Sequence, residues 1–491
     1  MNIVFYSTSA AQFDFDAVEL TTAPCRSAVW QELAARYREH RFFIVTQAPA
    51  SFLLDSALLQ AARARAPVTV GDATAHCLTL CDTVHISLLT AETPASAVAA
   101  YIATLQPDLA LAASFWLAPY DWLGLQDALV ADALRAQGIR TLCHAASLSL
   151  DCFDKSRTHA LLERHGFAMP KAVYVHHELY WCERRHHTLT TNVYKDYVLS
   201  ELRKLHYPVV IKDTVGLSSY SLEVAVSYKQ AVAYLNSGRT KVDRLVEEYI
   251  AGDQFGCEIY GSDGRYTVLP PLLFSLNRYG VTSPKQSVKL GGGLELAARF
   301  GFAALESRLR ALAEQLQPAG VMQVDLVRAH ADGRWYIIEL NPRLSGMSET
   351  YAALLGLPLM ELLLRTELSL PLAPAAMPMA PVQSAVPSPV SRAAAPPLQQ
   401  PALPCVCNLK LALISEEQRA ALAKEPAVAY LQRLYNRAAK QERERGYCEL
   451  VLRAPTLTAL MAALDDLAAR YADCMESAFV AKAHELASRL L

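Results

Sequence analysis

The chain has 491 residues, more than one ordinary hydrophobic core accommodates, so its length predicts two to four domains or subdomains. Its 46 Lys and Arg residues nearly balance 48 Asp and Glu residues, which gives a formal net charge of -2 at pH 7. A chain without a positive field is a poor ligand for a polyanion, so we do not expect nucleic acid as a partner.

The cysteines and the apolar segments bear on the cellular compartment. Eleven cysteines are scattered along the chain without a paired spacing, and the N-terminal stretch MNIVFYSTSAAQFDF lacks a basic region followed by an apolar segment and a cleavage site. The longest apolar stretch, YAALLGLPLMELLL, is broken by Pro358 and Glu361 and falls short of the roughly 20 residues that span a bilayer. We therefore expect a cytoplasmic enzyme with reduced thiols and no membrane partner.

Residues 1–150 alternate short β-rich runs with helical stretches. The runs NIVFYST, RFFIVTQ, TVHISLL, DLALAAS and IRTLCHA are separated by Ala- and Leu-rich segments such as AVWQELAARYREH and QDALVADALRAQG. This alternation predicts an α/β domain in which helices flank a parallel sheet. The first run is not followed by GxGxxG, so the fingerprint of a dinucleotide-binding domain is missing.

Residues 151–368 have a different sequence pattern, in which short predicted strands are separated by turns. The segment FDKSRTHALLERHGF predicts a helix that ends near Gly166, and Pro170 and a strand follow it. Further on, VMQVDLVRAHADGRWYIIELNP predicts a hairpin around the turn at Asp332 and Gly333. We expect an antiparallel-rich α+β domain here.

The last part of the chain is set off by proline. Ten of the 26 prolines fall between Pro371 and Pro404, so we expect residues 369–404 to form an extended linker. The following segment, 405–491, predicts a small α+β domain with a helix in QRLYNRAAKQERERG, a strand in YCELVLRA and a helix in TLTALMAALDDLAARYA. It carries no recognisable chemical motif.

The stretch WYIIELNPRLSG places polar side chains at the end of an apolar strand. Glu339, Asn341 and Arg343 alternate along it and therefore share one face. The predicted hairpin would bring Asp325 alongside Glu339. Such oxygen ligands suit Mg²⁺, whereas an acid and an amide left unpaired after WYII would cost free energy. The alternative is that they only end the strand.

Taken in order, the motifs of residues 1–368 resemble the ATP-grasp superfamily, in particular ligases of the D-alanine:D-alanine ligase and biotin carboxylase type. Members hold ATP between two α+β lobes, phosphorylate a carboxylate to an acyl phosphate, and let an amine displace the phosphate. The resemblance implies an ADP-forming ligase that joins a small carboxylate, such as an amino acid, to an amine, with ATP and Mg²⁺ or Mn²⁺ as cofactors. A carboxylate-thiol ligase, a carboxylate kinase, a non-catalytic ATP-binding scaffold and a homodimer stay open.

The resemblance implies a set of phosphate-binding residues. Lys155 and Lys212 match lysines that relatives place near the ATP phosphates, and Lys212 closes the apolar run PVVI, where a lysine without an anion would be costly to bury. The segment DTVGLSSYSLEV matches the loop that closes over the phosphates with backbone N–H groups and hydroxyls. It offers Gly216, Ser218 and Ser219. An ordinary hairpin turn and solvated lysines are the alternatives.

A second matching segment, LVEEYIAGDQFGCEI, resembles the hinge strand that meets the adenine and ribose of ATP. Gln254 stands at the ribose position, where relatives carry an acid, and an amide can still bond a hydroxyl. The residues matched to the adenine edge are Glu247, Glu248, Tyr249 and Ile250.

The resemblance also assigns Asp325, Glu339 and Asn341 to the metal and directs Arg343 at the transferred phosphoryl group, whose spread charge suits a guanidinium. The segment NRYGVTSPKQSVKLGGGLE matches a mobile loop that closes over the substrate, in which Lys289 or Lys285 would touch phosphate or carboxylate. Gly346 and Ser348 are further candidates for the substrate approach. The histidines of HHELYWCERRHH match no zinc-binding spacing, and we interpret this segment as a solvated insertion.

Overall fold

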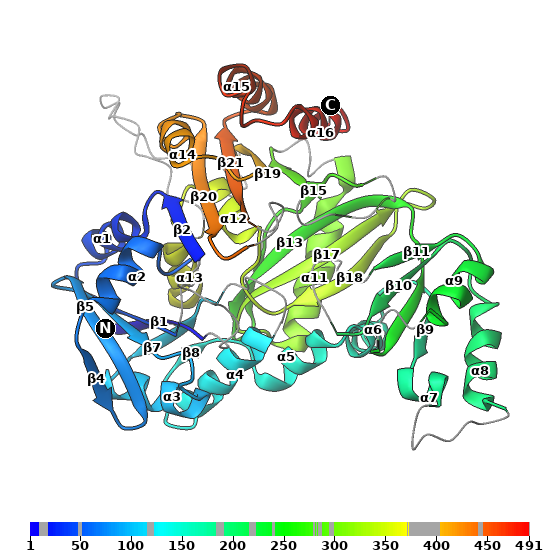
Figure 1. The fold of residues 1–491 in the computed structure, drawn as a ribbon, viewed down its shortest axis with the longest axis horizontal. Coiled ribbons are helices and arrows are strands. Elements are labelled where there is room, and N and C mark those ends of the chain that lie inside the picture. The colour runs from blue at the N-terminus through cyan, green and yellow to red at the C-terminus, as the bar shows by residue number, and fades with distance from the viewer. Residues whose placement is uncertain are drawn as a thin grey trace, which may run out of the picture.

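Three β-sheets with surrounding helices make up the molecule (Figure 1). The computed structural model describes residues 1–8, 18–47, 52–114, 122–182, 191–215, 222–237, 241–277, 280, 282, 287–293, 299–370, 372, 403–439 and 445–490. None of the eleven cysteines, which all fall in these ranges, forms a disulfide. Within the same ranges, no helix combines the length and apolar character needed to cross a membrane.

The first sheet has seven strands in the order β4-β5-β6-β3-β1-β7-β8. Five of them, β1, β3, β6, β7 and β8, run parallel, as the alternating pattern predicted. The antiparallel edge formed by β4 and β5 was not predicted. The strands are β1(Asn2–Ser7), β3(Arg41–Thr46), β4(Pro67–Val70), β5(Ala73–Cys81), β6(Val84–Leu89), β7(Leu109–Ala112) and β8(Thr141–Leu142).

Helices cover both faces of this sheet because its strands are apolar on both sides. Ile3 and Phe5 of β1 pack with Trp30 of α1, whereas Val4 and Tyr6 pack with the helices on the opposite face, α3 and α4. Such burial on both faces is typical of parallel sheets. The helices of this part of the chain are α1(Arg26–Arg36), α2(Ser56–Arg63), α3(Ala95–Thr104), α4(Trp122–Arg135) and α5(Ala146–Phe153), of which α5 packs in the core of the third sheet.

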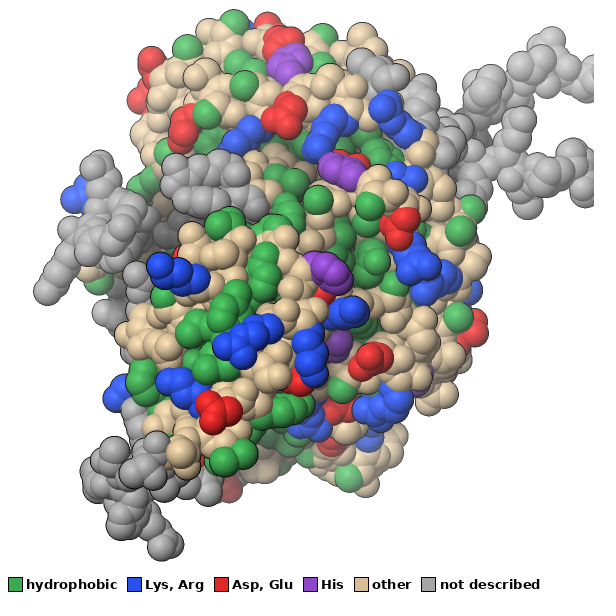
Figure 2. All heavy atoms as spheres, turned by 90° about the vertical axis from the view of Figure 1, so that its right-hand side faces the viewer, with side chains coloured by type: hydrophobic (Ala, Val, Ile, Leu, Met, Phe, Trp, Pro, Cys, Tyr) green, Lys and Arg blue, Asp and Glu red, His purple; other side chains and the backbone are tan. Residues whose placement is uncertain are grey.

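The second sheet is small and antiparallel, with the order β11-β10-β12-β9. Val209 and Ile211 of β10 form a separate core with apolar side chains of α7, α8 and α9. On the face of the molecule where this sheet lies, Lys and Arg side chains are interspersed with Asp, Glu and His (Figure 2). The elements are α6(Lys155–Arg164), β9(Ala172–Val175), α7(His177–Trp181), α8(Val193–Leu202), β10(Val209–Asp213), β11(Glu223–Ala225), α9(Tyr228–Leu235) and β12(Arg244–Glu248).

The third sheet has ten strands in the order β18-β17-β13-β15-β16-β19-β21-β20-β2, with β14 paired to β13. β17 and β18 form the predicted hairpin, in which Gly333 takes a positive φ of 69° that favours glycine. The elements of its central part are β13(Gly252–Ser262), β14(Arg265–Val268), β15(Leu272–Phe274), β16(Val288–Gly292), α11(Phe302–Leu316), β17(Gly320–Ala329), β18(Trp335–Asn341), α12(Ser348–Leu355) and α13(Leu359–Leu368).

The C-terminal segment continues this sheet. β19 pairs with β16, and β20 pairs with β2 from the N-terminal part of the chain, so one hydrogen-bonded sheet contains strands from the segments 1–150, 151–368 and 405–491. Hydrogen bonds between strands therefore link all three proposed domains. The division into those domains stays a prediction. The elements are β2(Val18–Ala23), β19(Cys405–Leu411), α14(Glu416–Leu422), β20(Val428–Asn436), β21(Gly446–Ala454), α15(Leu457–Arg470) and α16(Ser477–Ser488).

One secondary-structure prediction in this segment is wrong. The stretch beginning QRLYN, which we expected to be helical, continues β20 as far as Asn436. Its residues pair with β21 on one side and with β2 on the other. Helix propensity is a weak preference, and two hydrogen-bonded neighbouring strands override it here. The predicted strand YCELVLRA and the helix that follows it are confirmed as β21 and α15.

His144 joins the first sheet to the hairpin. It follows β8, is 4% exposed, and bonds the backbone at the start of β17 through both ring nitrogens. The Ala319 N–H donates to Nδ1 at 3.2 Å, which leaves the proton on Nε2, from which it is donated to the Val321 carbonyl at 2.8 Å. Because burial disfavours the charged ring, the pKa of His144 is lowered from 6.5 to about 4.

Replacing His144 by Asn should remove part of the acid sensitivity of the protein. In the wild type, the stabilisation by the neutral ring is complete above the unfolded pKa of 6.5 and is lost as the pH falls towards the folded pKa of about 4. This linkage amounts to about 2 kcal/mol of unfolding free energy between pH 7.5 and pH 5.0.

The measurement is the urea midpoint of unfolding at these two pH values. We expect the midpoint to fall less between pH 7.5 and pH 5.0 in His144→Asn than in the wild type. In the control His484→Gln, which replaces an exposed histidine of α16, the midpoint should fall as much as in the wild type. Equal shifts in the wild type and in His144→Asn would contradict the assignment.

Candidate functional site

The residues expected to bind a metal ion lie together on one face of the β17–β18 hairpin. Asp325 pairs directly with Glu339, and two positions along the same strands Asn341 pairs with Gln323. The side-chain amide of Gln323 donates to Asp325 Oδ1 at 2.8 Å. A β-bulge follows Asp325, so the register shifts just beyond the carboxylates. The antiparallel geometry thus brings the three expected ligands, Asp325, Glu339 and Asn341, to one face of the hairpin.

The two carboxylates oppose each other as like charges. Burial, and then the neighbouring charge of Glu339, raise the pKa of Asp325 to about 7. Burial also acts to raise the pKa of Glu339, but the three cations Lys155, Lys212 and Arg343 outweigh it and lower that pKa. A divalent cation would remove the repulsion and favour both charged forms.

A metal site here would need the amide as well as the acids. Among the residues that the structure describes, no group of three or more His, Cys, Asp or Glu side chains is arranged to hold a metal ion. Asp325 and Glu339 supply two carboxylates, and the Asn341 amide oxygen supplies the third donor on the same face. Such an all-oxygen set, completed by water and phosphate oxygens, suits Mg²⁺.

Both lysines expected near the phosphates are paired with acids. Lys155 Nζ lies 3.3 Å from Glu339 Oε1, and Lys212 Nζ lies 2.6 Å from Glu247 Oε2. Lys155 is the first residue of α6, and its backbone N–H donates to the Thr214 carbonyl, just beyond the strand that carries Lys212. This bond ties the two lysine-bearing segments together.

The expected hinge runs from β12 into β13. Glu247 is 5% exposed and holds Lys212, whereas Glu248 accepts hydrogen bonds from the backbone N–H of His206 at 2.9 Å and from its imidazole. Glu248 therefore stabilises the hinge itself. The described backbone continues through Ile250, which is partly exposed.

Tyr249 and Gln254 of the hinge converge on the carbonyl of Gly280. The Tyr249 hydroxyl donates to it at 3.2 Å, and the Gln254 amide nitrogen donates at 2.9 Å. Gly280 has a positive φ of 72°, and a Cβ there would lie 1.9 Å from the Tyr249 hydroxyl.

Arg343 lies directly after the hairpin, on the same side as the carboxylates. Its Nη2 donates to the Asn341 side-chain oxygen at 3.2 Å, and its Nη1 donates to the Leu344 carbonyl at 3.2 Å. These bonds hold the guanidinium beside the hairpin end, in the position that the alternation of residues 339, 341 and 343 predicted.

Lys289 differs from its prediction, because it lies in strand β16 and not in a mobile loop. It is 8% exposed, and its Nζ donates to the Gly346 carbonyl at 2.8 Å. The β-branched and apolar residues around it in SVKLGG pair with β15 and β19, which explains the strand. Lys289 therefore approaches the site from a rigid element.

Several predicted residues lie outside the described ranges. These are Gly216, Ser218, Ser219 and Lys285, together with part of the histidine-rich segment.

Glu258 is a buried acid that the sequence analysis did not select. It is 0% exposed in β13, and it accepts hydrogen bonds from the hydroxyls of Ser345 at 2.6 Å, Ser348 at 2.7 Å and Tyr260 at 2.7 Å. Burial raises its pKa although the three hydroxyls act in the opposite direction. Glu258 thus anchors the turn that follows Arg343. The signal was present in the sequence, as an acid within the apolar run FGCEIYG.

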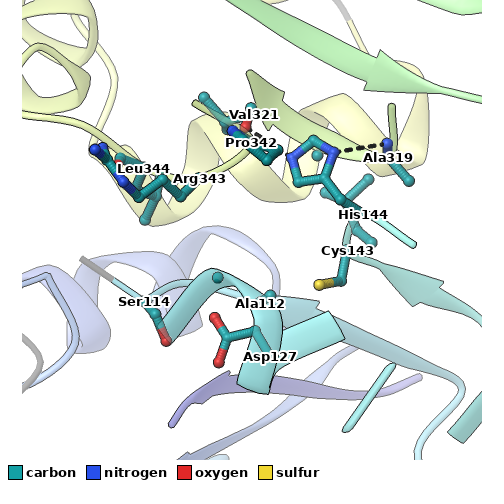
Figure 3. Close-up of a pocket in the computed structure, with 13 residues that line it drawn as sticks. Ala112, Ser114, Asp127, Cys143, His144, Ala319, Val321, Pro342, Arg343 and Leu344 are labelled. Carbon is teal, nitrogen blue, oxygen red and sulfur yellow. Dashed lines mark hydrogen bonds between the residues drawn. The ribbon is translucent and has the colours of Figure 1, made fainter. Parts of the chain in front are cut away.

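A small pocket, open to solvent, lies between the hairpin end and the first sheet (Figure 3). Arg343 and Leu344 line one side, and Ser114 and Asp127 line the other. β1 has β3 on one side and β7 on the other, so the order in which the chain adds strands to the sheet reverses between β1 and β7. In open α/β sheets, ligands bind at the carboxyl ends of the strands at such a switch point.

Asp127 is fixed at this switch point. It accepts hydrogen bonds from the backbone N–H of Thr8 at 3.1 Å and from the Thr8 hydroxyl at 2.5 Å. Thr8 follows β1, whereas Ser114, whose hydroxyl accepts from the same Thr8 N–H, follows β7. Burial raises the pKa of Asp127 to about 6 against the effect of these hydrogen bonds. The ends of the two strands are thereby locked to α4.

Comparison with known families identifies one domain of the chain. Residues 152–347 match the family model of the ATP-grasp domain, and the chain therefore contains an ATP-grasp domain. Over 236 residues it is 23% identical to the carbamoyl phosphate synthase large chain of Clostridium beijerinckii, a match covering 48% of this chain and 20% of that relative. The chain thus spans about a fifth of the length of this relative.

Solved structures share the fold over nearly the whole chain. The L-amino acid ligase from Bacillus licheniformis matches with a TM-score of 0.56 and 13% identity, covering 95% of this chain and 96% of that one. The biotin carboxylase domain of 2-oxoglutarate carboxylase from Hydrogenobacter thermophilus, a dimer solved with MgADP and bicarbonate, matches with a TM-score of 0.56 and 11% identity, covering 94% and 89%. The predicted fold class, with a parallel N-terminal sheet followed by an ATP-grasp domain, is confirmed.

We expect Glu339→Gln to weaken Mn²⁺ binding in the presence of ADP by at least about tenfold, because the substitution removes one of two carboxylate ligands. Electron paramagnetic resonance of free Mn²⁺ measures this affinity directly. The control is Asp332→Asn in the turn of the same hairpin, where the acid faces solvent and pairs with Arg334. Unchanged Mn²⁺ affinity in Glu339→Gln would rule out the metal site.

Proposed function

We propose that the chain is an ATP- and Mg²⁺-dependent ligase that activates the carboxylate of a small molecule, with an amino acid as the first candidate, and couples it to an amine. The observation that supports it is the convergence of Asp325, Glu339, Asn341 and Arg343 at the end of one hairpin, opposite two lysines. Such an arrangement matches phosphoryl transfer, in which catalysis consists mainly of positioning and charge stabilisation.

The lysines would bind the phosphates of ATP. Because Lys155 and Lys212 are already held by Glu339 and Glu247, little side-chain freedom is lost when phosphate oxygens join them. Mg²⁺, when bound to Asp325, Glu339 and Asn341, would neutralise charge on the phosphate oxygens. Tyr249, Ile250 and Gln254 lie along the hinge, where the nucleoside would be held.

The reaction would proceed in two displacements. An oxygen of the substrate carboxylate attacks the γ-phosphorus, the bond to the bridging oxygen breaks, and ADP leaves. The amine nitrogen then attacks the acyl carbon, phosphate leaves with the electron pair of the C–O bond, and the nitrogen loses a proton. The guanidinium of Arg343 would offset the charge that spreads over the phosphoryl oxygens.

The pocket beside Arg343 is our candidate for the site of the carboxylate substrate. It brings a fixed cation to one wall, and Ser114 and Asp127 to the opposite wall (Figure 3). A small molecule with an anionic and a polar or cationic end would meet complementary groups there. The similarity to an L-amino acid ligase supports amino acids as the first class to test.

The direct test is phosphate release from ATP and Mg²⁺ with pooled amino acids, followed by mass spectrometry of the products. Hydroxylamine should be included as a general nucleophile, because it converts an acyl phosphate into a stable hydroxamate whatever the natural amine is. An amide product supports the proposal. A hydroxamate without an amide indicates a kinase or a thiol ligase, and bound ATP without phosphate release indicates a scaffold.

Arg343→Lys should lower kcat by about 100-fold, although it keeps the charge, because an ammonium cannot reproduce the fork of the guanidinium. Arg343→Met should lower kcat further. Steady-state phosphate release measures both, and the control is Arg334→Lys on the solvent side of the hairpin, where the side chain pairs with Asp332. Full activity of Arg343→Met would exclude the role proposed for this residue.

A further inference from the structure

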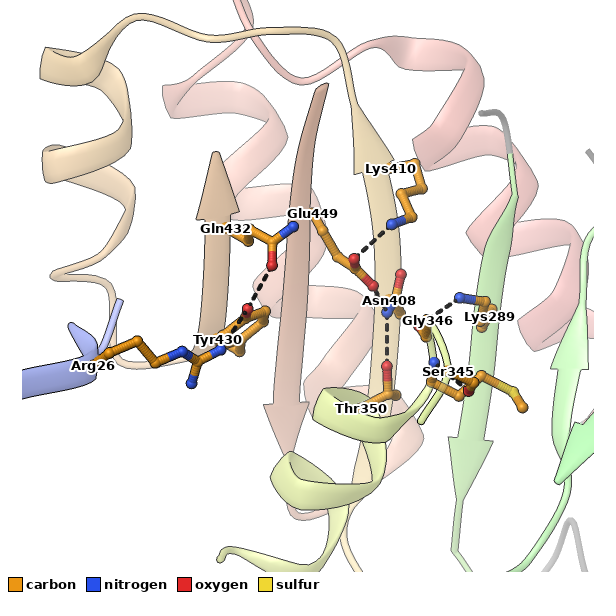
Figure 4. A network of polar contacts seen from close by, with 11 residues as sticks. Arg26, Lys289, Ser345, Gly346, Thr350, Asn408, Lys410, Tyr430, Gln432 and Glu449 are labelled. Carbon is orange, nitrogen blue, oxygen red and sulfur yellow. Dashed lines mark hydrogen bonds and ion pairs between the residues drawn. The ribbon is translucent and has the colours of Figure 1, made fainter. Parts of the chain in front are cut away.

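A row of polar side chains crosses the C-terminal part of the large sheet on the face that α12 covers (Figure 4). The row lies on four neighbouring strands, β16, β19, β21 and β20. The opposite face is apolar and packs against α15 and α16. The row consists of Lys289, Asn408, Lys410, Glu449, Gln432 and Tyr430, which are all buried or nearly so.

Glu449 is the acid at the centre of this row. It accepts a hydrogen bond from Asn408 Nδ2 at 2.7 Å and forms an ion pair with Lys410, whose Nζ lies 2.5 Å away. Asn408 is in turn the direct strand partner of Lys289, and its amide also donates to the Thr350 hydroxyl of α12 at 2.6 Å. The carboxylate is thereby held by Asn408, whose direct neighbour on β16 is Lys289.

The electrostatics connect Glu449 with Lys289. Burial lowers the pKa of Lys289 to about 8, and Glu449 exerts the largest opposing effect, favouring the charged amine. Burial likewise acts to raise the pKa of Glu449, but Lys410 and then Lys289 outweigh it. Glu449 and Lys289 thus favour each other's charged forms, whereas Lys410 of the same C-terminal segment opposes the charge of Lys289.

Lys289 in turn bonds the turn that follows Arg343. Its Nζ holds the Gly346 carbonyl at 2.8 Å, three residues beyond Arg343. The hydroxyls of Ser345 and Ser348 bind Glu258 on the other side of the same turn. The turn is thus held between two buried charged groups of opposite sign.

We propose that Glu449 is a positioning residue, which holds Lys289 against the Gly346 carbonyl and thereby fixes the turn of residues 343–348 at the active site. The C-terminal segment then completes the ligase site. This inference rests on the proposed function for its kinetic consequence. A buried ion pair is weak evidence for a role in stability alone, since its replacement by well-packed apolar residues often costs no stability.

The first test measures hydrogen exchange of a peptide covering residues 343–350 and needs no activity. In Glu449→Gln we expect the amides of this peptide to exchange at least about tenfold faster, because a hydrogen bond from a charged donor is weakened. The double variant Glu449→Gln with Lys410→Met removes one charge of each sign and provides a second variant should the single substitution prevent folding. Glu425→Gln is the matched control, since this acid pairs with Arg470 in the same segment, away from β16.

Lys289→Met should raise the exchange of the same peptide, and adding Glu449→Gln to it should cause no further increase. Unchanged exchange in both Glu449 variants, or increases that add up in the combined variant, would overturn the inference. Additive effects would mean that Glu449 acts on the turn by a route other than Lys289.

The second test repeats this cycle on kcat and KM. We expect Glu449→Gln to lower kcat by about tenfold with KM for ATP nearly unchanged, and to have no further effect in the Lys289→Met background. Activity in the wild type with independent losses in the two variants would contradict the inference and leave the proposed function standing. A wild type without turnover would refute the proposed function, and the exchange experiment would still decide the inference.

Discussion

The repulsion between Asp325 and Glu339 is the constraint around which the site is organised. Hydrogen bonding between β17 and β18 places the two acids directly opposite each other on one face of the hairpin. The surrounding cations approach from different elements: Lys155 from the start of α6, Lys212 from β10, and Arg343 from the turn after β18. Their charge keeps Glu339 ionised, whereas Asp325 is left with a raised pKa.

This arrangement explains why the turn after Arg343 needs support from several directions. A guanidinium beside two acids would be drawn towards them, and only a rigid turn keeps it where a third group can bind. Glu258 supplies one support through Ser345 and Ser348, and Lys289 supplies another through Gly346. Both come from strands of the same sheet as the hairpin, so the acids, the arginine and their supports belong to one rigid element.

The sequence predicted those features that depend on local periodicity. The parallel N-terminal sheet and the hairpin followed from alternation and turn residues, and the shared face of Glu339, Asn341 and Arg343 followed from the period of a strand. The roles of these residues stay predictions. Glu258 was missed because a single acid in an apolar strand does not reveal its partners, which lie 87 and 90 residues away at Ser345 and Ser348.

The C-terminal segment illustrates what periodicity cannot predict. In CVCNLKL, Asn408 and Lys410 alternate with apolar residues, a pattern typical of a strand with one face in solvent. Alternation identifies the residues that share a face, but it does not identify what covers that face. Here α12 covers it, and the polar residues become a buried network whose charges must be paired.

The proline-rich stretch likewise does not show whether the segments on its two sides fold separately or together. Residues 369–404 separate two segments along the chain, yet β19 returns to pair with β16, and β2 joins β20 from more than 400 residues away in sequence. A long connection costs little additional free energy, because the entropy of loop closure grows only with the logarithm of its length. The compositional boundary is therefore compatible with a single sheet. The strand that pairs with β19 is β16, and its Lys289 bonds the Gly346 carbonyl in the turn that follows Arg343.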